Sequence, residues 1–382
     1  MKILFQSRVD LYNPAGGDTA QMEQTKKALE ELDPNIKIDI SAKLRDSKIT
    51  NYDIVHLFNL DWVCETYLQV EWAKFNKKPV VLSAIHHSED EVKIFEDKAR
   101  YDIRRVYNFV IRSQQWRDMG KNLYRSIFNF KKLYPTLVQL FMGIRNQQKQ
   151  ILRMADMVLV QTNKEAEDIK KDFQIEDFKW SKVVNGVNTE IFNNPDIKNF
   201  KKPANGDMIL NVGRIEPRKN QIKLIEAFEK LRLEHKIYKD AILVFIGAYN
   251  DHSYEYKYRF DSAVKGNPNI YYMGKMKSEE VASAMAQAKV YVQPSWFETT
   301  GLVSIEAALA GARVVATGER IKEYLGDGAV YCDPASAASI KNAIIRSFEK
   351  SFDSADLKQK MLNHYSWNQV AKETLQIYNG LL

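Results

Sequence analysis

The chain has 382 residues, of which 45% are hydrophobic and 27% charged, and its formal net charge is +7. This composition is typical of a globular protein of two to three domains and excludes disordered, collagen-like and coiled-coil chains. Two cysteines cannot form a disulfide framework or a Cys-rich zinc site. We expect no secretion signal and no spanning helix, because the apolar N-terminal run is short and no run reaches about 18 apolar residues. The expected location is the cytoplasm.

The first half of the sequence alternates strand-like and helix-like segments. A strand is predicted at residues 2–6, followed by a Gly-containing loop and a helix at 19–32. Thr162 and Glu165 have the spacing of a capping box at the start of a later helix. Three apolar runs with β-branched residues predict buried parallel strands, at residues 54–58, 80–85 and 157–161.

One segment of the first half carries the positive charge. Residues 98–150 hold twelve Lys and Arg against two Asp, a net of +10, so the remaining residues carry a net charge of −3. Apolar residues recur there at helical spacing, namely Trp116, Met119, Leu123 and Ile127. A basic amphipathic helix of this kind can bind an anionic membrane surface. Alternatively, the segment is a helical insertion that packs on its own domain with its charges solvated. No nucleic-acid-binding motif accompanies the charge, so no nucleic-acid partner is expected.

The pattern stops between residues 193 and 207, where Asn-Pro, Lys-Pro and Asn-Gly pairs predict a domain linker. It then restarts, with strands predicted at residues 208–212, 241–246, 270–273, 290–293, 313–317 and 329–332. Strands that alternate with helices predict βαβ units and parallel sheets. We therefore predict two doubly wound, Rossmann-like α/β domains facing across a cleft. They are expected over residues 1–200, with a helical insertion at about 88–150, and over residues 201–362.

Arg214 and Lys219 follow the first predicted strand of the second half. Ligands of an open α/β sheet bind beyond the carboxyl ends of its strands. Arg can make two parallel hydrogen bonds to phosphate oxygens, and Lys adds a compact charge. The pair therefore favours a phosphate-bearing ligand, and the alternative is a solvated basic loop.

Two carboxylates flank a helix that is predicted to open near Gly301, after the strand at 290–293. The free N–H groups of a helix N-terminus can hold a diphosphate. Glu306, in the second turn, can then bind ribose hydroxyls, and Glu298, ahead of the helix, can bind sugar hydroxyls. Alternatively, Glu298 caps the helix and Glu306 is simply solvated.

Two further features lie in the first half. Gly16 and Gly17 let the backbone approach a ligand at a helix start, although a plain turn is the default. The Gly-x-Gly-x-x-Gly fingerprint is missing, which disfavours a dinucleotide-dependent oxidoreductase. His86 and His87 end the predicted strand at 80–85, and one of them can face the cleft. They are not a convincing metal pair, because successive residues point in different directions, and no metal is expected.

Together these residues resemble the family-4 retaining glycosyltransferases with the GT-B architecture. The resemblance rests on Gly16-Gly17, Gly213-Arg214 with Lys219, Glu298 and Glu306 at E-x7-E spacing, the turn at 185–188, and Tyr365-Ser366-Trp367. It implies a nucleotide-diphosphate sugar donor bound mainly by the C-terminal domain. Arg214 and Lys219 would then hold the diphosphate, Glu306 the ribose and Glu298 the transferring sugar.

The resemblance also implies roles for the remaining residues. Backbone N–H groups at Gly16 and Gly17 and around Thr300, Gly301 and Leu302 would complete the phosphate site. His86 is the better match to the family histidine near the anomeric carbon, although His87 leaves that assignment open. The last helix, from about residue 363 to 382, is expected to pack back on the N-terminal domain.

The implied chemistry is retaining transfer to an acceptor hydroxyl, by front-face attack. Negative charge grows on the leaving diphosphate, and Arg214, Lys219 and the helix N-terminus stabilise it. We therefore predict no cofactor and no metal requirement, with Glu298 positioning the sugar rather than attacking it. The expected acceptor is a saccharide or lipid-linked intermediate of surface polysaccharide, reached from the inner face of the membrane through residues 98–150. A catalytically silent GT-B scaffold or accessory subunit and a sugar-nucleotide epimerase are the alternatives.

Overall fold

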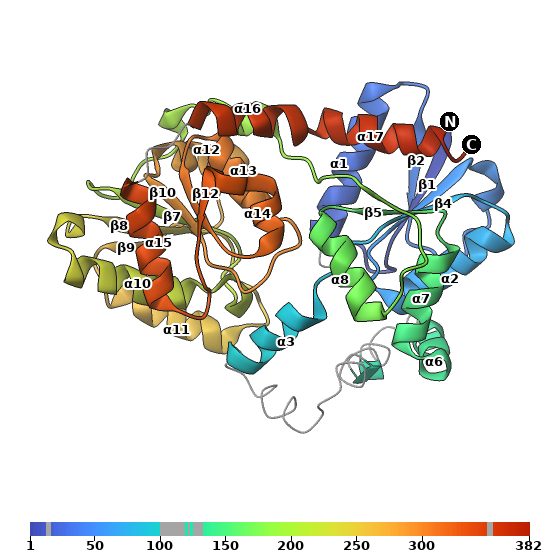
Figure 1. Ribbon diagram of the computed structural model, residues 1–382, viewed down its shortest axis with the longest axis horizontal. Helices are drawn as coiled ribbons and strands as arrows, with labels where there is room; N and C mark the ends of the chain where they lie inside the picture. Colours follow the sequence, from blue (N-terminus) through green and yellow to red (C-terminus); the bar gives the residue numbers. More distant parts are fainter. Residues whose placement is uncertain (13–16, 100–118, 121–122, 125–132, 350–353) are drawn as a thin grey trace. The chain divides into compact units, whose positions relative to one another are not determined.

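The computed structural model describes residues 1–12, 17–99, 119–120, 123–124, 133–349 and 354–382 (Figure 1). The chain divides into two compact units. Unit 1 comprises Met1–Glu89, Val106–Gly186 and Trp367–Leu382, and unit 2 comprises Asp90–Arg105 and Val187–Ser366. Trp116 and Ile127, on the helical face expected in the basic segment, lie outside the described residues, as does Gly16.

Unit 1 is built on a parallel sheet of six strands in the order β2-β1-β3-β4-β5-β6. Its strands are β1 (Lys2–Gln6), β2 (Lys37–Ser41), β3 (Ile54–Phe58), β4 (Val80–Ser83), β5 (Met157–Val160) and β6 (Trp180–Lys182). The predictions at 2–6 and 54–58 are confirmed. Sequence reasoning missed β2 and β6 because these two edge strands contain no continuous apolar run.

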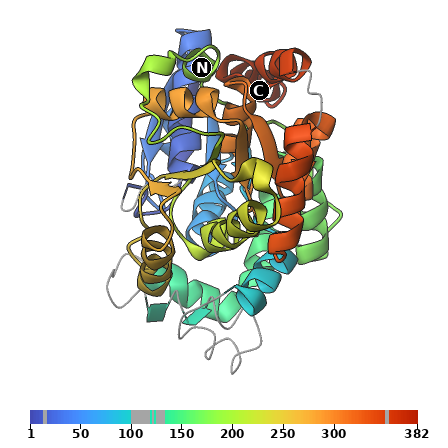
Figure 2. The ribbon, with the colours of Figure 1, turned by 90° about the vertical axis from the view of Figure 1, so that its left-hand side faces the viewer.

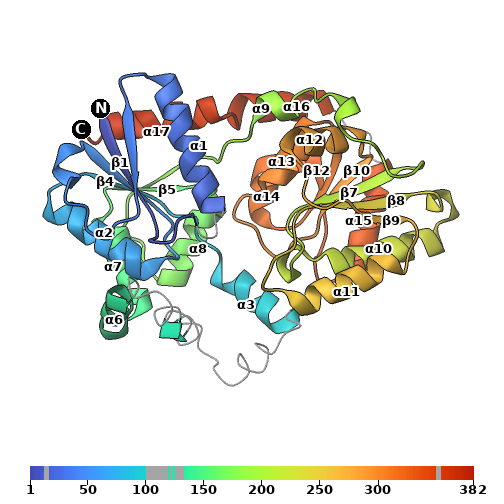
Figure 3. The ribbon, with the colours of Figure 1, turned by 180° about the vertical axis from the view of Figure 1, so that it is seen from behind.

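Helices cover both faces of this sheet (Figure 3). Successive strand residues point to opposite faces, so Phe5 and Leu4 belong to different core clusters. The Phe5 cluster packs against α1 (Gly17–Leu32) and α17 (Trp367–Asn379). The Leu4 cluster packs against α2 (Val63–Phe75), α7 (Ile144–Met154) and α8 (Asn163–Phe173). Helix α6 (Leu133–Met142) contacts α2 and α7, and a short η1 (Ile49–Asn51) precedes β3.

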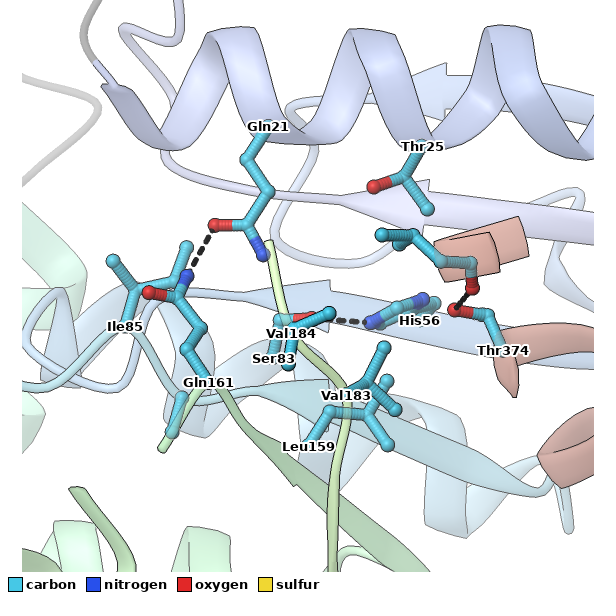
Figure 4. A pocket seen from close by; sticks show the side chains of 12 residues that line it. Gln21, Thr25, His56, Ser83, Ile85, Leu159, Gln161, Val183, Val184 and Thr374 are labelled. Atoms are coloured by element: carbon cyan, nitrogen blue, oxygen red, sulfur yellow. Dashed lines mark hydrogen bonds between the residues drawn. The ribbon is translucent and has the colours of Figure 1, made fainter. Parts of the chain in front are cut away.

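The C-terminal helix α17 packs along α1 in unit 1. Tyr378 Oη lies 2.5 Å from Nδ1 of His56 on β3. Burial lowers the pKa of His56 to about 3, so its ring is neutral. Beside His56 lies a cavity of about 10 Å³, the space of one water molecule, lined also by Gln21, Ser83 and Gln161 (Figure 4).

The turn at residues 185–188 marks the start of the passage to unit 2. A Cβ added at Gly186 would lie 2.6 Å from the Trp367 ring, so only glycine fits there. The next residue, Val187, donates its N–H to Tyr365 O at 2.8 Å. The chain passes from one unit to the other in two segments that are far apart in sequence, and these two segments lie side by side. Both segments were part of the family resemblance.

Unit 2 contains a second parallel sheet of six strands, in the order β12-β11-β10-β7-β8-β9. Its strands are β7 (Met208–Val212), β8 (Ile242–Ile246), β9 (Ile270–Tyr272), β10 (Val290–Gln293), β11 (Arg313–Ala316) and β12 (Ala329–Tyr331). All six strands fall at predicted positions, two with the predicted bounds and four one residue shorter at one end. Their continuous apolar character reflects burial on both faces.

The helices of unit 2 form two layers around its sheet (Figure 2). One core cluster joins the sheet to α10 (Gln221–Glu234), α11 (Tyr254–Lys265) and α15 (Ala337–Glu349). Contacts with β7, β10 and β11 are also made by α12 (Ser278–Gln287) and α13 (Leu302–Leu309). The remaining elements are α3 (Glu89–Lys98), α9 (Thr189–Phe192), η3 (Ile197–Asn199), η4 (Pro217–Lys219), η5 (Lys236–Tyr238), α14 (Glu319–Leu325), η6 (Gly326–Gly328) and α16 (Ser354–His364).

The boundaries of the units differ from the expected ones. The chain enters unit 2 at Val187, before the stretch at 193–207 that was expected to be the linker. Phe192 and Phe200 are buried, and Gln287 donates to the carbonyl of Phe200, so this stretch packs against α12. The described residues 90–99, expected in an insertion of the first domain, also belong to unit 2.

The predicted class of two doubly wound α/β units with parallel sheets is confirmed. Within the described ranges, no helix is long and apolar enough to cross a bilayer.

Candidate active site

The loops after β7 and β10 meet at one edge of the unit 2 sheet, because these two strands are neighbours. Lys219 ends the short helix η4 after β7, and its Nζ lies 2.5 Å from Oε1 of Glu298. Arg218 Nη1 lies 3.1 Å from the other oxygen of Glu298. The structure thus brings together two residues that sequence reasoning assigned to one ligand, Lys219 and Glu298.

Arg218 is a residue of this cluster to which sequence reasoning gave no role. Besides Glu298 it binds Glu216, with Nη2 3.1 Å from Oε1. Its guanidinium lies 5.5 Å from the centre of the Phe297 ring, and Phe297 in turn packs against Phe95 of α3 at 5.7 Å. The sequence did offer a signal for Arg218. It lies between Pro217 and Lys219, in a loop that was already expected to bind phosphate.

Arg214 is the exposed cation of this loop, with 56% of its side chain accessible. Its Nε lies 3.8 Å from Glu216, a distance at which solvent weakens the attraction. Lys219 and Arg218 are instead held by buried carboxylates. The cluster therefore contains three cations and two carboxylates, Glu216 and Glu298. The exposed cation is Arg214, so the excess positive charge is accessible to solvent.

Ionisation of Glu298 is controlled by these neighbours. Burial by itself would raise its pKa, but Lys219 and Arg218 outweigh burial and hold the pKa well below its usual value. The carboxylate is therefore charged at neutral pH and can accept hydrogen bonds from hydroxyl groups.

Helix α13 begins directly after Gly301, which adopts a left-handed φ of +63°. A Cβ at this position would lie 2.5 Å from Cδ1 of Ile321, which makes glycine necessary. Ser304 in the first turn donates to Gln293 Oε1 at 2.6 Å, which ties the helix to the end of β10. Thr300 is buried and Leu302 half-buried on either side of Gly301. The helix thus begins four residues after Glu298, the partner of Lys219.

Glu306 lies in the second turn of α13, as predicted from its spacing. Burial raises its pKa to about 7. Tyr291 on β10 is buried, which raises its pKa, and both Glu298 and Glu306 raise it further. The two carboxylates of the E-x7-E pattern therefore both affect the pKa of the same tyrosine, a residue that sequence reasoning had counted only as part of a strand.

A second polar cluster occupies the carboxyl edge of the unit 1 sheet. His86 is buried after β4, with Nδ1 2.8 Å from Asp61 and Nε2 2.9 Å from Asp172 of α8. Its backbone N–H donates to Glu165. Burial by itself would lower the pKa of His86, but Asp61 and Asp172 raise it to about 10, so the ring is a cation with both N–H groups engaged. His87 is 34% accessible and lies 3.4 Å from Asp61.

Sequence reasoning missed both carboxylates that hold His86. Asp61 follows β3, the neighbour of β4, and the rule that placed Arg214 could have found it. Asp172 lies within helix α8, 86 residues after His86 in the sequence. No sequence pattern near Asp172 indicates that it contacts His86. The capping box predicted at Thr162 is half present. Thr162 accepts from the Glu165 N–H, but the Glu165 carboxylate binds Gln161 and His86 instead.

Gly17, also expected to bind the donor, is the first residue of α1 and has open space on its Cβ side. Arg8 and Asp18, 3.3 Å apart, fix the backbone beside it. Among the side chains that the structure describes, no group of three or more His, Cys, Asp or Glu could hold a metal ion.

The sequence of unit 2 identifies its class. Residues 193–364 match the family described as Glycosyl transferases group 1, and this part of the chain is a domain of that family. Arg214, Arg218, Lys219, Glu298 and Glu306 all lie within it.

Two relatives show how far this similarity extends. The O-antigen chain mannosyltransferase B of Escherichia coli is 26% identical over 176 residues, which cover 45% of this chain and 45% of the relative. A D-inositol 3-phosphate glycosyltransferase of Nocardioides sp. is 24% identical over 253 residues, 60% of this chain and 55% of the relative. The chain thus spans about half the length of the curated relatives it matches.

Solved structures show the same fold over the whole chain. Sucrose-phosphate synthase from Thermosynechococcus elongatus superposes with a TM-score of 0.69 at 17% identity, covering 100% of this chain and 99% of that one. Anabaena HepE in complex with UDP and glucose superposes with a TM-score of 0.67 at 13% identity, covering 100% of both chains. The GT-B fold predicted from the sequence is confirmed.

Proposed function

We propose that the protein is a retaining glycosyltransferase that moves a sugar from a nucleotide-diphosphate sugar to an acceptor hydroxyl. The observation that carries the proposal is the cluster of Arg214, Arg218 and Lys219 around Glu216 and Glu298, shortly before the N-terminus of α13. Its position in a glycosyl transferases group 1 domain supports the same conclusion.

The donor diphosphate is assigned to the exposed end of this cluster. Arg214 is accessible, and the N–H groups of Gly301 and Leu302 at the start of α13 add partial positive charge. Lys219 and Arg218 stand behind, held in place by Glu298. Because these groups are positioned before the reaction, they can stabilise charge that develops on the leaving phosphate without reorganising.

Glu298 and Glu306 are assigned to hydroxyl groups of the donor. The ionised Glu298 accepts hydrogen bonds from the transferring sugar, and Lys219 keeps it charged and fixed. Glu306, in the second turn of α13, accepts from the ribose. Glu298 has the role of positioning the sugar, because its two oxygens are already engaged by Lys219 and Arg218 and would make a poor nucleophile.

The transfer step follows from these assignments. The bond from the anomeric carbon to the phosphate oxygen breaks, and its electron pair stays on the diphosphate. The acceptor oxygen bonds to the same face of the anomeric carbon, and its proton passes to the departing phosphate, so configuration is retained. The arginine, lysine and helix dipole supply the charge compensation, and we expect transfer without a divalent metal.

The two adjacent histidines of unit 1, His86 and His87, are assigned different roles. We assign His86 the role of a fixed internal cation, since both ring nitrogens donate to carboxylates. His87 is the candidate for contact with substrate, because its ring is partly accessible. We further propose a saccharide or lipid-linked acceptor, with residues 98–150 attracted to the anionic inner face of the cytoplasmic membrane.

The test is a thermal-shift screen of nucleotide sugars with the full chain, because a donor that binds the native state must raise its stability. A donor found in this way is then followed for release of its nucleoside diphosphate, with EDTA present. Release with EDTA and loss of release in Arg214→Ala support the proposal. Absence of any stabilising nucleotide sugar, or a strict need for added metal, contradicts it.

A further inference from the structure

Helix α6 of unit 1 exposes five large apolar or aromatic side chains and buries its polar residues Thr136 and Gln139. Both polar side chains face the protein. The outward face carries large hydrophobic residues, namely Leu133, Tyr134, Leu137, Leu140 and Phe141. Phe141 is 91% exposed and Leu137 43% exposed. This arrangement is the reverse of an ordinary surface helix, which turns its apolar face to the core.

The five exposed side chains form a continuous stripe, here called the α6 stripe. At 3.6 residues per turn they fall within about 120° of the helix circumference, along a helix about 15 Å long. The helix is held to the body of unit 1 by its contacts with α2 and α7, and Val138 and Met142 pack on the core cluster. The stripe is therefore a fixed, one-sided apolar surface, and its five side chains are exposed among the residues that the structure describes.

The charge of the sequence that flanks the stripe points to one occupant. Between residues 119 and 155 the sequence has seven Lys and Arg and no Asp or Glu. Among them Lys149 and Arg153 lie on α7, the helix that packs beside α6. An apolar surface within a purely basic segment is complementary to anionic lipid headgroups above acyl chains. A second copy of this chain would bring two such segments together, and their repulsion opposes dimer formation through the stripe.

We propose that the α6 stripe inserts into the interfacial layer of an anionic bilayer and anchors unit 1 to it. A helix of ten residues cannot span the bilayer, so it lies in the plane of the surface. The α6 stripe differs from the face expected at Trp116, Met119, Leu123 and Ile127, and it adds an apolar contact to the electrostatic one. The consequence for the acceptor, that the anchor gives unit 1 access to a lipid-linked substrate, rests on the proposed function.

The experiment is vesicle flotation of the full chain. Vesicles of phosphatidylcholine alone are compared with vesicles that also contain phosphatidylglycerol, each at low and high salt. The test variant is Phe141→Asp, because a side chain with 91% exposure can be changed without disturbing the core. The matched control is Leu233→Asp on α10 of unit 2, where the side chain is 83% exposed. Leu140→Asp is a second variant, and thermal melting checks that each is folded.

We expect the wild type and Leu233→Asp to bind the anionic vesicles, with a fraction that survives high salt because apolar insertion is not screened. Phe141→Asp and Leu140→Asp should weaken this binding at least about tenfold and lose the salt-resistant fraction. Unchanged binding by both variants overturns the proposal. So does a dimer of the wild type in sedimentation that Phe141→Asp dissociates, because the stripe would then face a second copy.

Donor turnover in the absence of vesicles separates this proposal from the proposed function. Phe141→Asp should turn over the donor at the wild-type rate, because α6 is remote in sequence from every proposed donor residue. If the wild type binds vesicles through Phe141 but turns over no nucleotide sugar, the proposed function is refuted and the membrane-anchor proposal stands. A wild type with turnover and no vesicle binding would refute the anchor alone.

Discussion

The two units place polar clusters at equivalent positions, the carboxyl edge of a parallel sheet, but arrange their charges in opposite ways. In unit 1 the cation is inside, with His86 buried between Asp61 and Asp172. In unit 2 the carboxylates Glu216 and Glu298 are inside, and the surplus cation Arg214 is exposed. In both units the cluster forms at the carboxyl edge of the sheet. Whether a cation or a carboxylate is buried there decides the charge that the cluster presents at the surface.

This difference separates a stabilising cluster from a binding one. A buried charge must be paired, and removing one partner costs free energy of folding. An exposed cation, such as Arg214 beside the paired Arg218 and Lys219, costs little free energy of folding. It remains available to an anionic ligand. We therefore expect mutations in the unit 1 cluster to affect stability first, and mutations in the unit 2 cluster to affect the donor first.

The largest expected effect is on stability, from Asp172→Asn. The change leaves the buried His86 cation with Asp61 alone, and we expect the unfolding free energy at pH 6 to fall by about 3 kcal/mol. Chemical denaturation of this variant is compared with Asp177→Asn, an exposed position that should change little. A loss at Asp172 no larger than that at Asp177 would contradict the assigned role of the cluster.

The pH dependence of this loss follows from the raised pKa of His86. A group whose pKa is about 10 in the folded state and 6.5 when unfolded contributes fully below pH 6.5. Its contribution is lost as the pH rises through 10. The deficit of Asp172→Asn should therefore be complete at pH 6 and shrink steadily between pH 6.5 and 10, and a deficit independent of pH in this window would argue against a charged His86.

Next in size is the effect of Lys219→Ala on turnover. Removing a positioned cation from the leaving diphosphate should lower the rate about 100-fold or more, in line with the loss of other transition-state donors. Lys223→Ala is the matched control, because Lys223 pairs with Glu226 on α10 outside the cluster. Equal rates for the two variants would remove Lys219 from the site and weaken the contrast between the clusters.

The smallest of these effects is a pH dependence of donor binding through Glu306. Its pKa is raised to about 7 by burial, and only the carboxylate can accept from two ribose hydroxyls. The affinity for a nucleoside diphosphate should therefore rise about tenfold between pH 6 and pH 8, as the ionised fraction rises. Titration calorimetry of the wild type and Glu306→Gln measures it, and a slope that persists in the variant must come from another group.

Unit 2 was predicted better than unit 1 from the sequence. The strands of unit 2 are continuous apolar runs, and its candidate site residues lie in the connections that follow these strands. Lys219 and Glu298 could be paired from sequence because each lies in the connection that follows a strand, and the two strands are neighbours. Asp172 could not be found, since it reaches His86 only through the packing of α8. The α6 stripe was equally hidden, because periodicity shows that a helix has two faces but not which one is buried.

The direct test of the central claim is titration of the full chain with a nucleoside diphosphate and with the corresponding nucleoside, in EDTA. The account predicts that the diphosphate binds much more tightly than the nucleoside, that this difference falls with salt, and that Arg214→Ala with Lys219→Ala removes it. Equal affinities of the wild type for the two ligands would contradict the claim that this cluster binds the leaving diphosphate.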